Sequence, residues 1–479
     1  MSIGFEPWAP LAELSASVRS GERKAVELLD EALGRVAATN DELNAFVHLD
    51  EGLAREAAGR VDAAVARGDD PGPLAGIPFG VKDLDDCAGM PTSHGSLWFK
   101  GGLPADRDGV DVARLRGAGA VPIGKTAAPE FGILNFARTK AWGVTRNPWD
   151  LSRTPGGSSS GSAAAVAAGV VPFATASDGG GSIRIPAAFC GLVGHKASFG
   201  RIAHPAAMTS QTTSVGVVTT TVAEAARCLD VEAGPDDHDR TSLPPPTLCY
   251  EDVIESLAVA GLRARWSPDL GFVEHVDPEV LELSQAAAEQ LAAAAGLDLD
   301  DQPVTLPDAT RVWLQSGVLD GWTRPEMADL WASRSEDLMP NTRKGFEASE
   351  EATAPRIGRI HRRRFEFEAA VADLFGEIDV LLLPSTAVPA FAAEGPPPGG
   401  AMSTPFTMLA NLCWNPATSV PAGLTSEGLP VGLQIVARRH RDEVCLRLAR
   451  ILEQTRPWPR TSSGVETSTD RGGSAPLRR

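Results

Sequence analysis

Two serines stand in glycine-rich runs where they could act as nucleophiles. The run GGSSSGS contains Ser158, and the run DGGGSIR contains Ser182. Glycines let the backbone curl so that successive N–H groups converge on one point. Such a group of donors can stabilise the negative charge of an oxyanion. These runs therefore indicate acyl-transfer chemistry on a serine, although their composition alone is equally compatible with flexible turns.

The base that activates a serine must come from elsewhere, because a serine hydroxyl is a weak nucleophile by itself. The eight histidines carry no recognisable signature, and we interpret His195, the nearest in sequence, as a structural residue. A buried lysine can serve instead, because desolvation disfavours its ammonium form. Lys82 ends the apolar run 75–81 and is the candidate base, the alternative being a strand-end lysine that reaches solvent.

Two other motifs match familiar patterns but fail on backbone grounds. Residues 119–126, GAVPIGKT, fit the P-loop pattern, yet proline has no N–H group with which to hold a phosphate. We interpret them as a buried strand. Residues 157–161, GSSSG, fit the nucleophile elbow GxSxG, but no strand-like segment precedes Ser159. We therefore do not assign Ser159 as the nucleophile.

The elements that must position these groups alternate between helices and strands. Helices are expected over 9–67, 107–118, 161–169 and 442–454, and strands over 77–82, 120–124, 170–175, 379–384 and 431–436. Such alternation predicts an α/β fold with a mixed, largely buried sheet. We expect one domain over 1–462, with its core in 60–235 and 376–456, a helical insert over about 236–375, and a disordered tail over 463–479.

Charge and composition restrict the class of partner. The chain of 479 residues has 62 acidic and 44 basic side chains and a formal charge of −18, which argues against nucleic acid or an anionic membrane. The six cysteines form no CxxC pair, and neither a signal peptide nor a membrane-length apolar run is recognisable. We expect a cytoplasmic protein that acts on a small molecule without a metal or other cofactor; a homodimer is left open.

The segment from Thr154 to Arg201 resembles the signature of the amidase signature family, whose hydrolases use a Ser-cisSer-Lys triad. The motifs that carry the resemblance are GGSSSGS, DGGGSIRIP and the upstream GIPFGVKD, and the likeness extends over nearly the whole chain. The resemblance implies the amidase signature fold, in which helices cover both faces of the central sheet.

The resemblance also implies a role for each matching residue. Lys82 would be the neutral base, Ser158, at a cis peptide bond, would relay protons, and Ser182 would be the nucleophile. The other implied roles are an oxyanion site of Gly179, Gly180, Gly181 and the Ser182 N–H group, supporting contacts from Asp178 and Arg184, and a substrate contact from Gly132. We add Ser159 as a further supporting residue and the aromatic Phe131, next to Gly132, as a further substrate contact. The common Gly-Thr-Asp before the glycines is ASD in this chain, a departure that we interpret as not touching the triad.

The activity that the resemblance implies is hydrolysis of a linear carboxamide, a carbon–nitrogen bond other than a peptide bond, through an acyl-enzyme on Ser182. A carbamate (urethane) or an ester is an alternative for the same triad. An RNA-dependent amidotransferase subunit is disfavoured, because that branch usually has Gln where this chain has Ile185. Aromatic residues within 130–142 and 310–345 are compatible with an aryl or hydrophobic substrate and equally with ordinary core packing.

Overall fold

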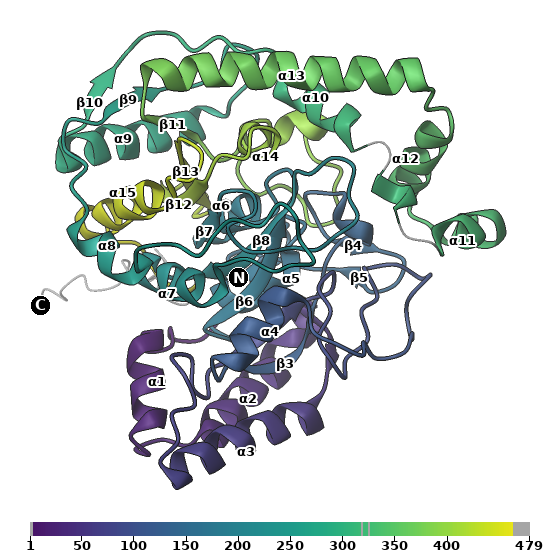
Figure 1. Ribbon diagram of the computed structural model, residues 1–479, viewed down its shortest axis with the longest axis vertical. Helices are drawn as coiled ribbons and strands as arrows, with labels where there is room; N and C mark the ends of the chain where they lie inside the picture. Colours follow the sequence, from purple (N-terminus) through teal and green to yellow (C-terminus); the bar gives the residue numbers. More distant parts are fainter. Residues whose placement is uncertain (1–2, 318–319, 324–325, 463–479) are drawn as a thin grey trace, which may run out of the picture.

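The computed structural model describes residues 3–317, 320–323 and 326–462, and one mixed sheet organises them (Figure 1). Within these residues its eleven strands lie in the order β1, β3, β2, β6, β8, β7, β12, β13, β11, β9 and β10. In that order they span Phe46–Leu49, Val121–Thr126, Pro78–Lys82, Phe173–Asp178, Ser214–Thr219, Val193–Lys196, Ala417–Leu424, Pro430–Ala437, Val380–Pro384, Arg263–Trp266 and Asp298–Asp300. A separate short pair consists of β4, Arg138–Thr139, and β5, Gly143–Val144.

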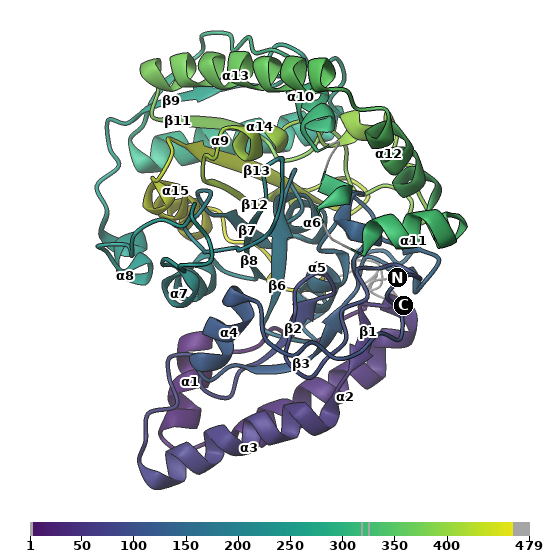
Figure 2. The same cartoon turned by 45° about the vertical axis from the view of Figure 1, so that its right-hand side comes forward.

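Fifteen α-helices within the described part of the chain surround this sheet. They are α1 Leu11–Arg19, α2 Ala25–Leu43, α3 Glu51–Arg67, α4 Val110–Gly117, α5 Ser160–Ala167, α6 Arg184–Cys190, α7 Val222–Glu232, α8 Tyr250–Ser256, α9 Pro278–Ala295, α10 Ala309–Ser316, α11 Met327–Arg334, α12 Pro340–Glu350, α13 Ala354–Glu377, α14 Met408–Leu412 and α15 Asp442–Thr455. In Figure 2, α2 and α3 lie below β1–β3, and α13 lies at the opposite end of the molecule.

The alternation of side chains along β13 shows that helices cover both faces of the sheet. Leu433 and Ile435 belong to the apolar cluster that includes residues of α9 and α15. Gly432 and Gln434 face the other way, toward α6, where Gln434 accepts a hydrogen bond from Arg184. Because successive residues of a strand point to opposite faces, α6 and the α9–α15 pair lie on opposite sides. The predicted mixed α/β fold with helices on both faces is confirmed.

Two segments that the sequence predicts as helical are mainly helical but also contribute short strands. The predicted helical stretch 9–67 contains β1, which pairs antiparallel with β3. The predicted helical insert 236–375 contains β9 and β10, which extend the main sheet parallel to β11. The sequence of β9, RARW, is short and polar, so it lacks a strand signal. Its Arg265 is satisfied by ion pairs with Asp300 (2.6 Å) and Glu377 (3.2 Å), contacts that only the folded chain provides.

The stretch that fits the P-loop pattern forms strand β3, as its proline and branched residues predict. β3 is buried along its whole length and pairs with β1 and β2. The lysine of the pattern, Lys125, is buried and donates hydrogen bonds to the carbonyl of Asp85 and to Thr92 Oγ1. Its ammonium group is therefore engaged inside the protein.

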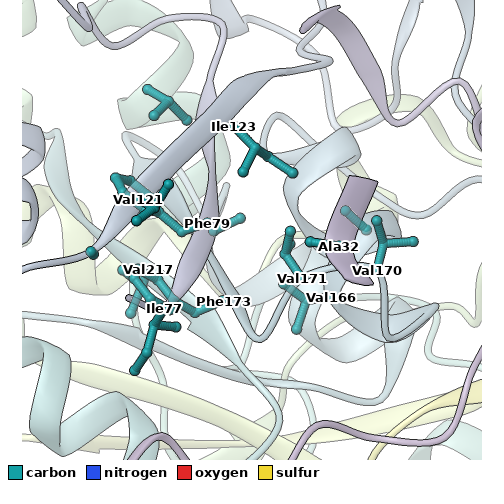
Figure 3. Close-up of a cluster of buried hydrophobic side chains, with 14 of the residues drawn as sticks. Ala32, Ile77, Phe79, Val121, Ile123, Val166, Val170, Val171, Phe173 and Val217 are labelled. Carbon is teal, nitrogen blue, oxygen red and sulfur yellow. The ribbon is translucent and has the colours of Figure 1, made fainter. Parts of the chain in front are cut away.

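The core beneath the candidate site is built by β2 and β6, which run parallel. Phe79 pairs with Phe173 in register, and their rings stack with centroids 5.1 Å apart (Figure 3). Parallel strands end at the same edge of a sheet, so the polar residues that follow these apolar segments are brought together. Lys82 ends β2 and Asp178 ends β6.

The predicted disordered tail, 463–479, lies outside the described residues. Among the helices that the structure describes, none combines the length and the apolar composition that crossing a membrane requires.

Candidate active site

Lys82 lies at the centre of the candidate site with its side chain wholly buried. Its Nζ lies 2.9 Å from Ser158 Oγ and 2.8 Å from Ser159 Oγ. The hydroxyl and the carbonyl oxygen of Ser177 lie 2.8 Å and 3.2 Å from the same atom. The alternative interpretation of Lys82, a strand-end lysine that reaches solvent, is therefore wrong.

Burial lowers the pKa of Lys82 to about 8, although the charges of Asp85 and Asp178 act in the opposite direction. A neutral amine keeps a lone pair, which can accept a proton from a neighbouring hydroxyl such as that of Ser158. The contact with Ser177 also corrects the interpretation of the ASD departure. Ser177 belongs to that departure, and its hydroxyl contacts Lys82 of the predicted triad.

Asp85 is a buried residue that is linked to Lys82 and that no sequence motif singled out. Thr175 Oγ1 donates a hydrogen bond to Asp85 Oδ2 (3.0 Å) and accepts one from the backbone N–H of Lys82 (2.8 Å). Asp85 also donates its own N–H to the carbonyl of Lys82 (2.9 Å). Its position three residues after Lys82 is visible in the sequence, but the link through Thr175 depends on the pairing of β2 with β6.

Ser158 is buried, and the peptide bond that joins it to Gly157 is cis. The turn Glu130–Gly132 approaches it closely. Gly132 has a φ of +73°, and a Cβ built on it would lie 3.2 Å from Ser158 Oγ. Glycine is suited to this position because the turn requires a left-handed conformation and a close approach to the serine. Gly132, predicted as a substrate contact, is thus adjacent to the Lys82–Ser158 pair.

Ser182 is partly exposed and lies on the loop after β6. The loop is tied to the first serine run by the N–H of Ser159, which donates to the carbonyl of Ser182 (3.3 Å). The Ser182 hydroxyl makes no hydrogen bond to other residues of the described part of the chain. It is therefore free to meet a substrate, next to the run that holds Ser158.

The glycine loop offers fewer free donors than the sequence predicts. The N–H of Gly181 donates to Asp178 Oδ1 (2.6 Å), so the oxyanion role predicted for this group is corrected. The N–H groups of Gly179, Gly180 and Ser182 have no hydrogen-bond partner among the residues that the structure describes. These three remain available to an oxyanion.

Asp178 holds this loop through its carboxylate, which accepts hydrogen bonds from the backbone N–H groups of Gly181 and Ile183. Arg184 donates to both of its carboxylate oxygens, from Nε and Nη2, each over 2.9 Å, and both side chains are fully buried. Asn411 of α14, which the sequence analysis missed, donates to Asp178 Oδ1 (2.8 Å) and to its carbonyl (2.7 Å). Burial alone would raise the pKa of Asp178, but the charge and hydrogen bonds of Arg184 outweigh it and hold that pKa well below its usual range.

Phe131 belongs to an aromatic cluster that flanks Gly132. Its ring lies 6.0 Å from Trp98 and 6.5 Å from Phe346, which belongs to α12. We call these rings and the neighbours they touch the Phe131 cluster; it comprises Trp98, Phe99, Phe131, Trp322, Trp331 and Phe346. Phe136, by contrast, packs against Phe391 and is ordinary core.

The remaining candidates from the sequence lie apart from this chemistry. His195 on β7 is buried and bonds Thr418 Oγ1 (2.8 Å), with Asp442 Oδ1 3.4 Å away on its other side. These neighbours agree with its interpretation as a structural residue. Within residues 3–317, 320–323 and 326–462, no group of three or more His, Cys, Asp or Glu side chains could hold a metal ion.

Comparison with known proteins relates nearly the whole chain to one family. The family model described as Amidase matches residues 27–446. An acylamidase of Rhodococcus erythropolis is 35% identical over 472 residues, covering 94% of this chain and 96% of that protein. A subunit of the glutamyl-tRNA(Gln) amidotransferase of Synechococcus sp. (strain RCC307) is 36% identical over 484 residues, covering 93% and 97%. The crystal structure of a bacterial aryl acylamidase belonging to the amidase signature family superposes with a TM-score of 0.86 at 26% identity, covering 96% of this chain and 98% of that one.

Proposed function

The chain belongs to the amidase signature family, and from this premise we propose that it is a serine amidohydrolase that cleaves a linear carboxamide into a carboxylate and an amine. The observation that carries the proposal is the 2.9 Å contact between the buried Lys82 Nζ and Ser158 Oγ. A lysine whose pKa lies near 8 can act as a base at physiological pH.

In the proposed acylation, the Ser182 hydroxyl attacks the carbonyl carbon of the substrate. Its proton passes to Ser158 as Ser158 gives its own proton to the neutral amine of Lys82. The N–H groups of Gly179, Gly180 and Ser182 stabilise the resulting oxyanion. When the carbon–nitrogen bond breaks, the proton returns from Lys82 through Ser158 to the departing nitrogen. An amine and an acyl-enzyme on Ser182 result.

Deacylation repeats the relay with water in place of Ser182. Lys82 accepts a proton from the attacking water through Ser158, and the tetrahedral intermediate uses the same donors. The C–O bond to Ser182 then breaks, Ser182 regains a proton by the relay, and the carboxylic acid leaves and ionises. Each step uses only groups of this chain, the substrate and water.

We propose an aryl or hydrophobic amide as the substrate class. Two features support it: the Phe131 cluster beside Gly132, and the acylamidase and aryl acylamidase among the similar proteins. Apolar rings around a site favour substrates with apolar groups, because burying those groups removes them from water.

A substrate panel should therefore show a preference for N-acyl anilides. We expect kcat/KM for an acyl anilide to exceed that for a short aliphatic amide by about 10-fold or more, since one buried aromatic group contributes roughly 1.5–3 kcal/mol. Initial rates on an acyl anilide, an aliphatic amide, an aryl carbamate and an aryl ester measure this. A carbamate or ester cleaved much faster than every amide would replace the amide proposal with the corresponding hydrolase.

An amidotransferase subunit is the second candidate function, because a similar protein carries that name. Ile185, where that branch usually has Gln, and the buried, fully satisfied Arg184 before it give no support to it. Glutaminase activity that requires a copurifying partner would support this candidate. A single chain that cleaves amides by itself would argue against it.

The pH dependence of the reaction should report the protonation of Lys82. Burial places its pKa at about 8, so the fraction of neutral amine, and with it kcat/KM, should rise with pH through that value and then level off. Asp85 and Asp178 are the charged neighbours that favour the ammonium form. Replacing Asp85 with Asn removes one negative charge, so the pKa should fall and the rising limb should move to lower pH, by roughly 0.5–1 unit.

Glu224→Gln is the matched control for this prediction. Glu224 is also a buried carboxyl, but its charge is not among those that act on Lys82, and neither Lys82 nor Asp85 is among the groups that act on it. The limb should stay in place in this variant. An Asp85→Asn profile that coincides with the wild-type profile, or moves to higher pH, would contradict the assigned electrostatic role.

A further inference from the structure

The loop Asp178–Ser182, which we call the oxyanion loop, is held by two side chains that lie far from it in the sequence. Trp313 Nε1 donates to the carbonyl of Gly179 (2.6 Å). Thr407 Oγ1 donates to the carbonyl of Gly180 (2.6 Å). The Gly179–Gly180 and Gly180–Gly181 peptide groups are consecutive, and the carbonyl of each accepts a hydrogen bond from a side chain in a distant part of the sequence.

The two planes differ in what happens at their N–H ends. A trans peptide unit is rigid and planar, and its C=O and N–H bonds point in opposite directions. In the Gly180–Gly181 plane the N–H also bonds, to Asp178 Oδ1, so this plane is fixed at both ends. In the Gly179–Gly180 plane the N–H of Gly180 has no partner among the described residues. Its direction is determined at the carbonyl end, where Trp313 bonds.

Packing reinforces this hydrogen bond. A Cβ built on Gly180 would meet Cε2 and Cζ2 of Trp313 at 2.6 Å, so the indole lies directly on the glycine. Gly180 has no positive φ that would demand glycine. The absence of a side chain is therefore needed here for the approach of the indole.

Trp313 is carried by α10, which lies beside the long helix α13 in both views of the molecule (Figures 1 and 2). Asp308 caps the start of α10 by accepting from the N–H of Arg311 (3.1 Å). Gln315 accepts a hydrogen bond from Arg363 of α13 (3.0 Å). The indole is thus presented by an anchored helix of the segment 236–375.

We propose that Trp313 is a positioning residue for the reaction: its indole N–H holds the Gly179–Gly180 peptide plane so that the Gly180 N–H is directed at the oxyanion. The inference deepens the proposed function and rests on it. It gives the segment 236–375 a part in catalysis through α10. Trp313 itself does not need to touch the substrate in this role.

The test compares Trp313→Phe with Trp149→Phe. Trp149 is a matched control, because its Nε1 likewise donates to a backbone carbonyl, that of Cys190 (2.8 Å), and its ring packs on the following glycine, Gly191, outside the oxyanion loop. We expect Trp313→Phe to lower kcat on an acyl anilide by roughly 10–100-fold, below the loss of about 10²–10³ that follows removal of a whole donor. KM should change less than 3-fold, and Trp149→Phe should retain kcat.

A trifluoromethyl ketone inhibitor gives a second measurement, because its adduct with a serine places an oxyanion at this site. Its affinity should fall in Trp313→Phe by the same factor as kcat. Replacing the indole at position 313 with benzothiophene, by incorporating benzothienylalanine, keeps the ring shape and deletes only the donor. This variant should show the same two losses, and it tests the proposal even if the phenylalanine variant does not fold.

Three results would overturn the proposal. They are an unchanged kcat in the benzothiophene variant, a rise in KM alone, and equal losses in the Trp313 and Trp149 variants. The activity of Ser182→Ala in the same assay distinguishes a failure of this proposal from a failure of the proposed amidohydrolase function. If Ser182→Ala is active, the proposed function fails; if it is inactive while the Trp313 variants behave as wild type, only the role of Trp313 fails.

Discussion

Replacing Ser182 with alanine should reduce the turnover of an acyl anilide by about 10⁴–10⁶-fold, the range seen when the nucleophile of a serine hydrolase is removed. The reason is that no acyl-enzyme can form. The fold should be unaffected, because the Ser182 hydroxyl makes no hydrogen bond to the described part of the chain and its side chain is partly exposed. Thermal unfolding followed by circular dichroism should coincide with that of the wild type.

A covalent serine probe tests the assignment of Ser182 as the nucleophile without a measurement of turnover. An aryl fluorophosphonate should add one label to the wild-type chain, on the peptide that contains Ser182, and none to Ser182→Ala. Peptide mass spectrometry identifies the labelled residue. Retention of near-normal turnover in Ser182→Ala, or labelling of Ser158 or Ser159 in the wild type, would refute the assignment of the nucleophile.

Replacing Lys82 with methionine should abolish activity, by about 10³-fold or more, while leaving the protein at least as stable near neutral pH. Methionine keeps the length and apolar stem of the lysine but supplies no base. The expected stability of this variant follows from the pKa of Lys82 in the wild type. Burial lowers it from the ordinary 10.5 to about 8, so at pH 7 the folded state holds an ammonium group that it disfavours.

The pKa values of Lys82 in the folded and unfolded states determine the sign of this effect. Below pH 8 the lysine is charged in both states, and the folded state bears the full cost, of the order of 3 kcal/mol for a shift from 10.5 to about 8. Between pH 8 and 10.5 the unfolded chain binds more protons than the folded chain, so stability rises with pH. That pH-dependent gain should be absent from Lys82→Met. Equilibrium unfolding in urea at pH 7 and pH 9.5 measures it.

Lys196→Met is the matched control for the loss of activity in Lys82→Met. Lys196 is likewise buried, and burial and the charge of Arg184 lower its pKa to about 7. Its Nζ bonds only the carbonyl of Ala197 in the described part of the chain (2.9 Å), so it takes no part in the relay. We expect this variant to keep turnover within a few-fold of the wild type. Comparable activity in Lys82→Met would contradict the role of Lys82 as the base.

Elements with an apolar or small-residue pattern are the ones that the sequence predicts. β2 and α5 lie within two residues of their predicted bounds, 77–82 and 161–169, whereas β6 begins three residues later than the predicted 170–175. β9 is missed because two of its four residues are arginines whose partners come from other elements. Local pattern predicts an element when burial demands apolar residues, and fails when ion pairs across the fold satisfy polar ones.

The same division holds for the candidate site. Residue type and spacing single out Lys82, Ser158 and Ser182, because only a few side chains can attack a carbonyl or accept a proton, and glycines must precede a cluster of N–H donors. Which of those donors is free depends on tertiary contacts. The N–H of Gly181 points at Asp178, and that arrangement requires Arg184 and the distant Asn411 around the carboxylate.

The sequence by itself thus determined the chemistry that the chain can carry, since that depends on the kinds of side chain present and on short spacings along the backbone. The tertiary structure decided how the chemistry is tuned. Three features arise from segments brought together by the sheet and its helices. They are the burial of Lys82, its hydrogen-bonded link to Asp85 through Thr175, and the packing of the Trp313 indole on Gly180. Burial, charge and direction act through space, and no local pattern of residues encodes the distances on which they depend.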